Sequence, residues 1–425
     1  MNTSYSTEIT TSVRQSNFEL LRIFSMLMII ASHWGWWIVG VPTTLESQYH
    51  VIFHTFFRTF GQVGVIIFIL LSGYFLCTSK FKIISLLKLL EQVFFYVVFL
   101  LLFYYLQGYI NSGVAPTLGI SAITDWFTPI SSGRWWFFSC YVALYLISPF
   151  LNRLIERLKK HEFRLLLCVL FLFVSIFPSF FVLTTANDAM QNMIIFIFVY
   201  FIGAYIRLYQ EDFQSKSLCL FGAVLSLVIF VIGKKIGFIE YRYFLYVIIL
   251  SVFIFLTFMH LKIQSRVINK CAKSTFGVYL LHDNAVVTFW LWNDVFAIQN
   301  FANTPWFIPV SILSVIVTFI VCALIDYIRQ LCFEPILMSF LNRNKINKVL
   351  IHIDSRMPIN SVKAEENTQS DNKPIYLLLF INALYLLCKL IAIYLNKNIT
   401  YKLFLVIFIA GIFAINRIEN KGEEC

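Results

Sequence analysis

Long apolar runs, separated by short polar segments, dominate this chain from residue 18 onward. About 20 mainly apolar residues are enough for a helix to cross the hydrocarbon core of a bilayer. The ninth run is the weakest, because His282, Asp283 and Asn284 interrupt it. The pattern therefore predicts an all-α, polytopic integral membrane helix bundle with spans at 18–40, 59–78, 86–107, 134–151, 164–183, 192–209, 217–233, 243–260, 275–295, 307–329, 375–396 and 400–416.

Polar segments divide the predicted bundle into a core and a C-terminal pair of helices. The start of the chain has no short apolar region followed by a small-residue cleavage site, so we expect no signal peptide. The segment 341–374 is polar and mixed in charge, which indicates a linker. The predicted organisation is a cytoplasmic tail at 1–17, a ten-helix transmembrane core at 18–340, a cytoplasmic linker at 341–374, two additional transmembrane helices at 375–417 and a cytoplasmic tail at 418–425.

Composition excludes a soluble or disordered chain. Of the 425 residues, 59% are hydrophobic and 13% are charged, and the mean hydropathy is +0.78. Soluble domains average about 45–50% apolar and about 25% charged residues. The nine cysteines form no C-x-x-C pair and have no histidine at zinc-ligand spacing, so the sequence predicts no metal site. It also lacks a phosphate-binding loop and the G-x-S-x-G elbow of serine hydrolases.

The net charge of +11 indicates membrane topology rather than a nucleic-acid partner. With the N-terminus inside, 25 of the 33 Lys and Arg residues fall in inner segments, 7 fall in outer segments and Lys389 lies within a span. Because positive residues gather in cytoplasmic loops, we expect both termini in the cytoplasm and a multi-pass protein of the plasma membrane. The abundance of Phe, Ile, Asn and Lys is typical of AT-rich bacterial genomes.

Charged and polar side chains form one stripe along the first predicted helix. Arg22 and His33 are eleven residues apart, which places them about 20° apart around the helix and about 16 Å apart along it. Glu19 lies on the same face, three residues before Arg22. This spacing predicts a carboxylate and a guanidinium near the cytoplasmic rim and an imidazole near the middle of the bilayer. Two interpretations stay open: a rim ion pair with a histidine that bonds a neighbouring helix, or a general base below an anion-binding mouth.

The stretch Asn17–His33 resembles the opening helix of the membrane-bound acyltransferase 3 family. Further stretches resemble the family pattern in the same order, and together they cover roughly residues 17–340. They are L-S-G-Y-F-L at 71–76 with S-K-F-K at 79–82, the tryptophan-rich R-W-W-F-F-S-C-Y run at 134–152, T-F-G-V-Y-L-L-H at 275–282 and F-E-P at 333–335. The last two predicted spans lie beyond this core, and no soluble esterase-like extension follows it.

The resemblance implies transfer of an acyl group, usually acetyl, from cytosolic acyl-CoA to a hydroxyl of a surface polysaccharide or lipid-linked sugar of the cell envelope. Acetyl-CoA is then a donor substrate, and no cofactor is bound permanently. His33 matches the family's general base, and Glu19 and Arg22 match the charged positions before it. The expected donor-binding residues are Arg22, Lys80, Lys82, Lys88 and His282. The expected acceptor-binding residues are Arg134, Trp135, Trp136 and Asp283.

Several of these assignments have structural alternatives. Relatives often carry paired arginines where this chain has Lys80 and Lys82, and lysine lacks the arginine fork. The loop lysines also fit plain positive-inside topology, and Trp135 and Trp136 fit an interfacial aromatic belt. We expect His282 to lie somewhat closer to the cytoplasm than His33. Asp326 and Arg329 are interpreted as a rim ion pair.

Three other functions compete with acyl transfer. A glycan or small-acid transporter or flippase is the main alternative, although repeated halves and broken helices are not evident in the sequence. A glycan polymerase leaves the stripe on the first helix unexplained. A scaffold does not justify charges inside the membrane. Loss of glycan esters without loss of glycan export would separate an acyltransferase from a transporter.

Overall fold

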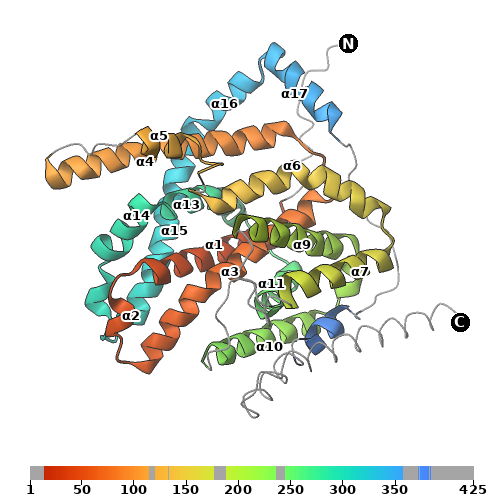
Figure 1. Ribbon diagram of the computed structural model, residues 1–425, viewed down its shortest axis with the longest axis horizontal. Helices are drawn as coiled ribbons and strands as arrows, with labels where there is room; N and C mark the ends of the chain where they lie inside the picture. Colours follow the sequence, from red (N-terminus) through yellow and green to blue (C-terminus); the bar gives the residue numbers. More distant parts are fainter. Residues whose placement is uncertain are drawn as a thin grey trace, which may run out of the picture.

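The computed structural model describes residues 14–113, 120–132, 134–176, 188–235, 245–357, 372, 374–381 and 383. Within these residues every regular element is a helix (Figure 1). The first half contains α1 (Ser16–Trp37), α2 (Val41–Thr44), α3 (Gln48–Leu76), α4 (Ile83–Ser112), α5 (Ile120–Phe127), α6 (Trp136–Arg157), α7 (Lys160–Phe171), η1 (Leu172–Ile176) and α9 (Asp188–Leu208). The second half contains η2 (Gln210–Phe213), α10 (Lys216–Lys235), α11 (Leu245–Met259), α12 (Arg266–Lys273), α13 (Thr275–His282), α14 (Ala285–Trp290), η3 (Leu291–Val295), η4 (Ile298–Phe301), α15 (Phe307–Cys332), α16 (Glu334–Leu341) and α17 (Asn344–Arg356).

The described helices have the length and apolarity of membrane spans. Five segments qualify by both criteria, and they are α1, α3, α4, α6 and the stretch from α15 into α16. Three shorter apolar helices lie at Asn192–Leu208, Lys216–Ile232 and Leu245–Met259. The chain is therefore an all-α polytopic membrane protein, as the sequence predicted.

Within the described residues, each of the first ten predicted spans coincides with helical structure, with two informative differences; residues 177–183 of the fifth span and 243–244 of the eighth lie outside the described residues. The helix α3 begins at Gln48, eleven residues before the predicted start of its span. The ninth span is not continuous, because α13 ends at His282 and α14 begins at Ala285. Residues 375–381 and 383 of the eleventh span are helical, and the rest of the eleventh span and all of the twelfth lie outside the described residues.

Helices α1 and α3 run side by side through the middle of the bundle (Figure 1). Their close approach depends on small residues. A Cβ at Gly61 would collide with Ser32, and a Cβ at Gly64 would lie 2.5 Å from the backbone oxygen of Ser25. Small residues at such crossings let helix backbones pack closely in membranes. This contact fixes the position of the C-terminal half of α1, which carries His33.

The break in the ninth span is closed by side-chain hydrogen bonds. Asn284 caps α14, and its Oδ1 accepts a hydrogen bond from the backbone nitrogen of Val286 at 3.1 Å. The hydroxyl of Thr288 donates to the carbonyl oxygens of Asn284 at 2.6 Å and His282 at 2.9 Å. These bonds satisfy backbone groups that a broken helix leaves free. Polar side chains can therefore occupy the break at a fixed position.

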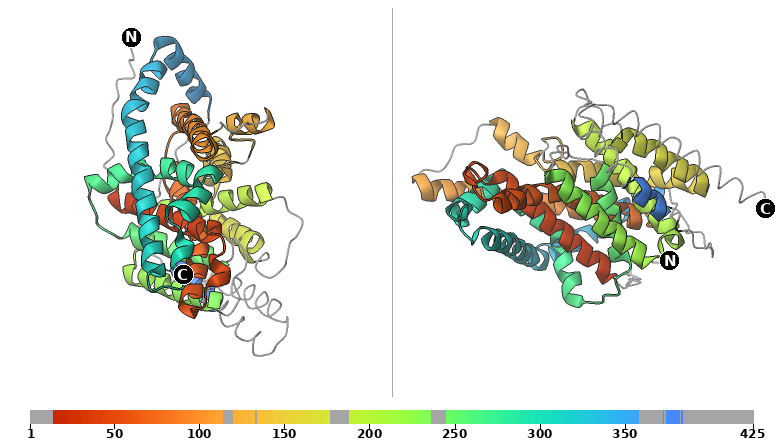
Figure 2. Two further views of the ribbon diagram at one scale, coloured as in Figure 1. Left: turned by 90° about the vertical axis from the view of Figure 1, so that its left-hand side faces the viewer. Right: turned by 90° about the horizontal axis from the view of Figure 1, so that it is seen from below.

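The long helix α15 rises from the bundle to α16 and α17 at its end (Figure 2, left). The helix α17 lies inside the segment predicted as a linker. Its Asp354 accepts a hydrogen bond at 2.8 Å from the backbone nitrogen of Ile83, the first residue of α4. A carboxylate at a helix N-terminus is favourable because free N–H groups point toward it. Part of the linker segment thus packs against the core.

The buried apolar residues form two clusters. The first contains residues of α3, α9 and α11, such as Leu70, Tyr200 and Phe253, and residues 375 and 381 also belong to it. The second contains residues of α1, α4, α13 and α15, such as Trp34, Val97 and Leu280. The candidate site described next lies where α1 meets α13, within the second cluster.

Candidate active site

Three polar side chains from α1 and the end of α13 meet one another. Nδ1 of His33 lies 2.9 Å from Nε2 of His282, and Nε2 of His33 lies 3.3 Å from Oδ1 of Asp283. His282 is fully buried, whereas the side chains of His33 and Asp283 keep 21% and 16% of their surface exposed. We call these three residues the histidine cluster. It is partly accessible, although it lies between helices.

The position of the cluster differs from the sequence-based expectation. His33 lies four residues, or about 6 Å, before α1 ends at Trp37, so it is closer to that end than to the middle of the helix. The rings of His33 and His282 are in contact, with centroids 5.0 Å apart. The break after α13 thus brings His282 beside His33, and the expectation that His282 lies somewhat closer to the cytoplasm stays a prediction.

The hydrogen bonds of the cluster determine which nitrogen of each neutral ring carries a proton. Nδ1 of His282 lies 2.6 Å from the carbonyl oxygen of Val278, which only accepts, so this nitrogen donates. Nε2 of neutral His282 then holds a lone pair, and Nδ1 of His33 donates to it. The remaining nitrogen, Nε2 of His33, holds a lone pair and is the basic atom of the cluster.

Asp283 lies beside this basic atom. When Nε2 of His33 accepts a proton, the ring becomes a cation with the carboxylate of Asp283 at 3.3 Å. A carboxylate at that position stabilises an imidazolium and restrains the orientation of the ring. The cluster can therefore accept a proton from a group that reaches Nε2 of His33 and can return that proton later.

A buried polar network holds α13 against α15 and α4. Asp326 is fully buried, and its Oδ1 accepts hydrogen bonds from Tyr96 at 2.8 Å and Gln92 at 2.9 Å. Nε of Arg329 donates to the same oxygen at 2.8 Å. Gly277 packs so closely on this carboxylate that a Cβ there would collide with it. The predicted ion pair of Asp326 and Arg329 is therefore present, and helix α4 buries both side chains.

Two further contacts complete this network. Nη1 of Arg329 donates to Oε2 of Glu91 at 3.1 Å. The amide of Gln330 bonds Oδ2 of Asp326 at 2.7 Å and the hydroxyl of Ser274 at 3.0 Å, just before α13 begins. Because buried charges are costly without partners, this set of contacts fixes one arrangement of α13 and thus of His282.

The first turn of α6 approaches the histidine cluster through Tyr279. The rings of Phe137 and Tyr279 are 5.8 Å apart, and the phenol of Tyr279 lies within interaction range of the Asp283 carboxylate. On the side of Arg22, the phenol of Tyr141 lies within electrostatic range of that guanidinium. The helix α6 therefore contacts α13 through Phe137 and comes within range of Arg22 on α1 through Tyr141.

The three residues predicted to bind the acceptor lie at the start of α6 and differ in accessibility. Trp135 is fully buried, and its indole nitrogen has no hydrogen-bond partner among the described residues. Trp136 is half-buried and packs against Phe196 with ring centroids 6.3 Å apart. Arg134 is also half-buried, and its guanidinium lies 4.0 Å from the ring centroid of Trp126. Arg134 and Trp136 are thus the members of this group that keep exposed surface.

Glu19 and Arg22 form an ion pair at the opposite end of α1. Nη1 of Arg22 lies 2.6 Å from Oε2 of Glu19, and Nη1 of Arg14 lies 3.6 Å from Oε1. Glu19 is buried, and 28% of the Arg22 side chain is exposed. The pair is separated from His33 by about three helical turns, so it does not contact the histidine cluster.

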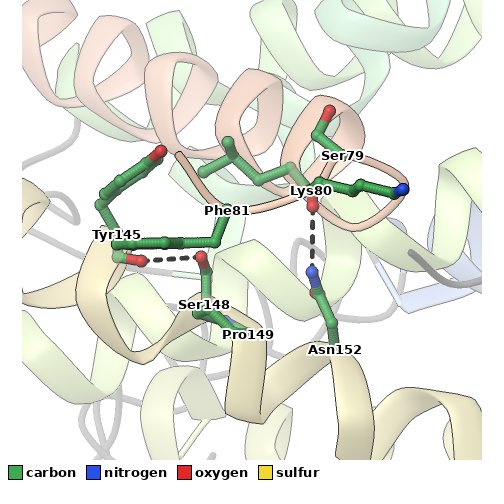
Figure 3. A pocket seen from close by; sticks show the side chains of 8 residues that line it. Ser79, Lys80, Phe81, Tyr145, Ser148, Pro149 and Asn152 are labelled. Atoms are coloured by element: carbon green, nitrogen blue, oxygen red, sulfur yellow. Dashed lines mark hydrogen bonds between the residues drawn. The ribbon is translucent and has the colours of Figure 1, made fainter. Parts of the chain in front are cut away.

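Lys80 and Lys82 lie in the loop between α3 and α4, and both are exposed. Lys80 lines a small pocket together with Phe81, Tyr145 and Asn152 (Figure 3). Asn152 donates to the carbonyl oxygen of Leu76 at 2.9 Å. The hydroxyl of Tyr145 donates to the carbonyl oxygen of Lys82 at 2.8 Å. These bonds to α6 hold the loop in place and present both lysines at its surface.

Lys88 is placed differently from the two loop lysines. Its Nζ lies 3.2 Å from Oε1 of Glu334, and both side chains are about 40% exposed. The carboxylate at the start of α16 therefore offsets much of the charge of Lys88. Of the three lysines predicted to bind the donor, Lys80 and Lys82 have no ion pair among the described residues.

The structure unites residues to which the sequence assigned separate roles. His33, His282 and Asp283 were predicted as base, donor-binding and acceptor-binding residues, and they form one cluster. Sequence reasoning missed the carbonyl of Val278, for which no sequence signal exists. It also passed over Arg58 as a loop charge, although a charge within the apolar run of α3 was a signal.

Comparison with known proteins identifies the family of the chain. A family model described as an acyltransferase domain, that of the acyltransferase 3 family, matches residues 15–324. No curated protein and no solved structure matches the chain. The match includes α1 with His33, the loop with Lys80 and Lys82, and the break with His282 and Asp283. The chain therefore belongs to the acyltransferase 3 family and is a multi-pass membrane acyltransferase.

Proposed function

We propose that this protein is an O-acetyltransferase of the plasma membrane of a bacterium, with both termini in the cytoplasm. It transfers the acetyl group of cytosolic acetyl-CoA to a hydroxyl of a surface polysaccharide or lipid-linked sugar. The observation that carries this proposal is the lone pair on Nε2 of His33, which is partly exposed and has a carboxylate 3.3 Å away. Acyl transfer to a hydroxyl requires a base of this kind.

His33 is the catalytic residue of the proposed reaction. Its Nε2 takes the proton of the acceptor hydroxyl while the hydroxyl oxygen bonds the thioester carbonyl carbon. The tetrahedral intermediate then breaks its carbon–sulfur bond, and the sulfur of coenzyme A leaves with the proton returned by His33. Asp283 stabilises the imidazolium between these steps, and His282 holds Nδ1 of His33. His282 and Asp283 are thus positioning residues, which act on the reaction through the orientation and the protonation of His33.

Acetyl-CoA enters at the end of α1 that carries Arg22. Its phosphates bind the exposed cations of Lys80 and Lys82, with Arg22 as a third cation and Lys88 contributing less because Glu334 neutralises it. The thioester end then extends toward His33 over the interval of about 16 Å between Arg22 and His33. No group needs to stay bound between turnovers, because acetyl-CoA is consumed.

The acceptor approaches from the opposite end, near the start of α6. Arg134 and Trp136 keep exposed surface there, and an aromatic face beside a guanidinium suits a sugar ring and its hydroxyls. Trp135 contributes a buried N–H group without a partner among the described residues. This arrangement separates donor and acceptor on two sides of the histidine cluster.

Transfer of label from radioactive acetyl-CoA to the host's glycans tests this proposal. We expect wild-type protein in nanodiscs to transfer label and His33→Ala to lose at least about 100-fold in rate, since general base catalysis contributes about 10²–10⁴-fold. His50→Gln is the matched control, because His50 lies at the outer end of α3 and bonds the carbonyl of Ala302 instead. Equal transfer by wild type and His33→Ala would contradict the role of His33.

The break between α13 and α14 is the one observation that favours a transporter. Discontinuous helices with polar groups at the break occur at the substrate sites of transporters. The two functions predict different results in cells that lack the gene. An acyltransferase defect leaves glycan export intact and removes acetyl esters, whereas a transporter defect lowers export.

A further inference from the structure

Arg58 places a guanidinium inside the membrane-spanning helix α3 without a charged partner. The residue lies ten positions after the start of α3 and is half-buried. Its side chain makes no hydrogen bond and no ion pair with the part of the chain that the structure describes. Its Cζ lies 3.3 Å from the ring centroid of Trp36, which is a cation–π contact. A half-buried cation that no carboxylate neutralises is costly, so Arg58 is a candidate for a functional role.

Other cations of the bundle, unlike Arg58, form ion pairs with carboxylates. Arg22 is paired with Glu19, Arg329 is paired with Asp326, and Lys88 is paired with Glu334. Stacking on an indole orients the plane of the guanidinium but leaves its five N–H donors free. Arg58 therefore has donor capacity that nothing in the described structure uses. That capacity matches an anion with two or more oxygen atoms.

Arg58 lies close to the histidine cluster. Trp36 follows His33 by three residues on α1, and residues at this spacing have Cβ atoms about 5–6 Å apart. The hydroxyl of Ser32 donates to the carbonyl oxygen of Arg58 at 2.7 Å. A Cβ at Gly35 would lie 3.0 Å from the Cα of Arg58. Residues 32, 35 and 36 thus hold Arg58 beside the turn of α1 that carries His33.

The side of the cluster on which Arg58 lies is the acceptor side. Arg58 and Trp36 are near the end of α1 opposite Arg22, and Trp36 is 54% exposed. Arg134 repeats the same arrangement at the start of α6, with its guanidinium over Trp126 and no ion pair among the described residues. Both arginines on this side stack on a tryptophan, although Arg134 also lies within electrostatic range of the Asp125 carboxylate, whereas Arg58 forms no ion pair with a carboxylate of the described residues.

We propose that the acceptor is an anionic glycan and that Arg58 binds its phosphate or carboxylate group next to the hydroxyl that is acetylated. This inference rests on the proposed function for the identity of the acceptor. Binding of the anion to Arg58 orients the sugar toward Nε2 of His33. A neutral sugar binds more weakly, because it leaves the guanidinium of Arg58 without an anionic partner. A diphosphate that links a sugar to a lipid and a uronic acid share the required chemistry.

Ligand-dependent thermal unfolding in nanodiscs of zwitterionic lipid tests the inference without requiring turnover. The probes are farnesyl-diphosphate-linked N-acetylglucosamine, octyl glucuronide and neutral octyl glucoside. For wild type we expect at least one anionic probe to raise the unfolding temperature at a concentration about 10–100 times lower than the neutral probe, the range for one charged hydrogen-bonded contact. The stronger of the two anionic probes identifies phosphate or carboxylate as the group.

Variants assign this preference to Arg58. Arg58→Gln removes the charge and should abolish the preference for the anionic probe. Arg58→Lys keeps the positive charge but loses the planar guanidinium, so this variant should retain only part of the preference for the anionic probe. If Arg58→Gln does not fold, Arg58→Lys replaces it in the test. Arg153→Gln is the matched control, since it removes an exposed arginine at the other end of α6 and should behave like wild type.

Each contrary result has a defined meaning. Equal stabilisation of wild type by anionic and neutral probes overturns the inference, and so does a preference that Arg58→Gln retains. Loss of the preference in nanodiscs containing phosphatidylglycerol overturns it as well, because a lipid headgroup then occupies Arg58. Label transfer from acetyl-CoA is measured on the same samples. An anion preference without transfer contradicts the proposed function alone, and equal transfer to neutral and anionic probes contradicts the inference alone.

Discussion

Two histidines of the same cluster differ in what they can do. Both ring nitrogens of His282 are used, one by the carbonyl of Val278 and one by His33, and the side chain is fully buried. His33 is partly exposed, and its Nε2 retains a lone pair. Proton transfer to a substrate therefore belongs to His33. Local environment, rather than residue type, separates the two roles.

Asp283 provides a test at this scale. Asp283→Asn keeps the size of the side chain and removes the charge beside Nε2 of His33. We expect the rate of acetyl transfer to fall about 10–100-fold, which is the value of one hydrogen bond to a charged group. The KM for acetyl-CoA should stay unchanged. Initial-rate measurements at varied acetyl-CoA check this, and a raised KM with an unchanged kcat would show that Asp283 acts on the donor instead.

The sequence identified part of the site because Glu19, Arg22 and His33 share one helix. Helical spacing alone places them on one face. The contact between His33 and His282 joins residues 249 positions apart and depends on how α13 packs. Spacing carries no information about that packing. For the same reason His282 and Asp283 were assigned to donor and acceptor binding separately.

At the scale of helices, the network around Asp326 fixes α13. It joins α4, α15 and the start of α13, and it includes the contact between Gly277 and Asp326. The break after α13 was foreshadowed by the polar residues His282, Asp283 and Asn284. The helix α17 was not foreseen, because its segment is polar and its packing on α4 is visible only in the structure.

The network predicts a large difference between two substitutions. Asp326→Ala leaves Arg329 and three other donors without this carboxylate, and we expect a loss of about 3–5 kcal/mol in the free energy of unfolding. Lys88→Met breaks the half-exposed pair with Glu334 and should cost about 0–1 kcal/mol. Unfolding of the two variants in the same detergent compares these values. Similar stability of both variants would contradict a structural role for the network.

At the scale of the whole molecule, the distribution of charge determines the orientation in the membrane. The apolar pattern located the long helices of the core, because burial in lipid demands long apolar runs, but it did not locate the short helices α2, α5, α12 and α16. It did not locate the boundaries of α3, since a helix continues past the apolar region when other helices cover it. The orientation itself stays a prediction from the positive-inside bias.

Cysteine labelling in intact cells tests this orientation. In a background without native cysteines, Thr43→Cys near α2 and Ser79→Cys before α4 both introduce an exposed thiol. We expect a membrane-impermeant maleimide to label position 43 in intact cells and position 79 only after lysis. The reverse pattern would place the loop lysines outside, where acetyl-CoA is absent, and would contradict the proposed route of the donor.

The central claim is that Nε2 of His33 accepts the proton of the acceptor hydroxyl. Rescue of His33→Gly by added imidazole tests this claim most directly, because a small base can fill the space left by the ring. We expect the lost acetyl transfer to return in proportion to the concentration of neutral imidazole, and to fall when the medium is acidified, since imidazolium cannot accept a proton. His282→Gly should show no such rescue. Binding of acetyl-CoA that stays intact in His33→Gly, together with no rescue at any pH, would contradict the account.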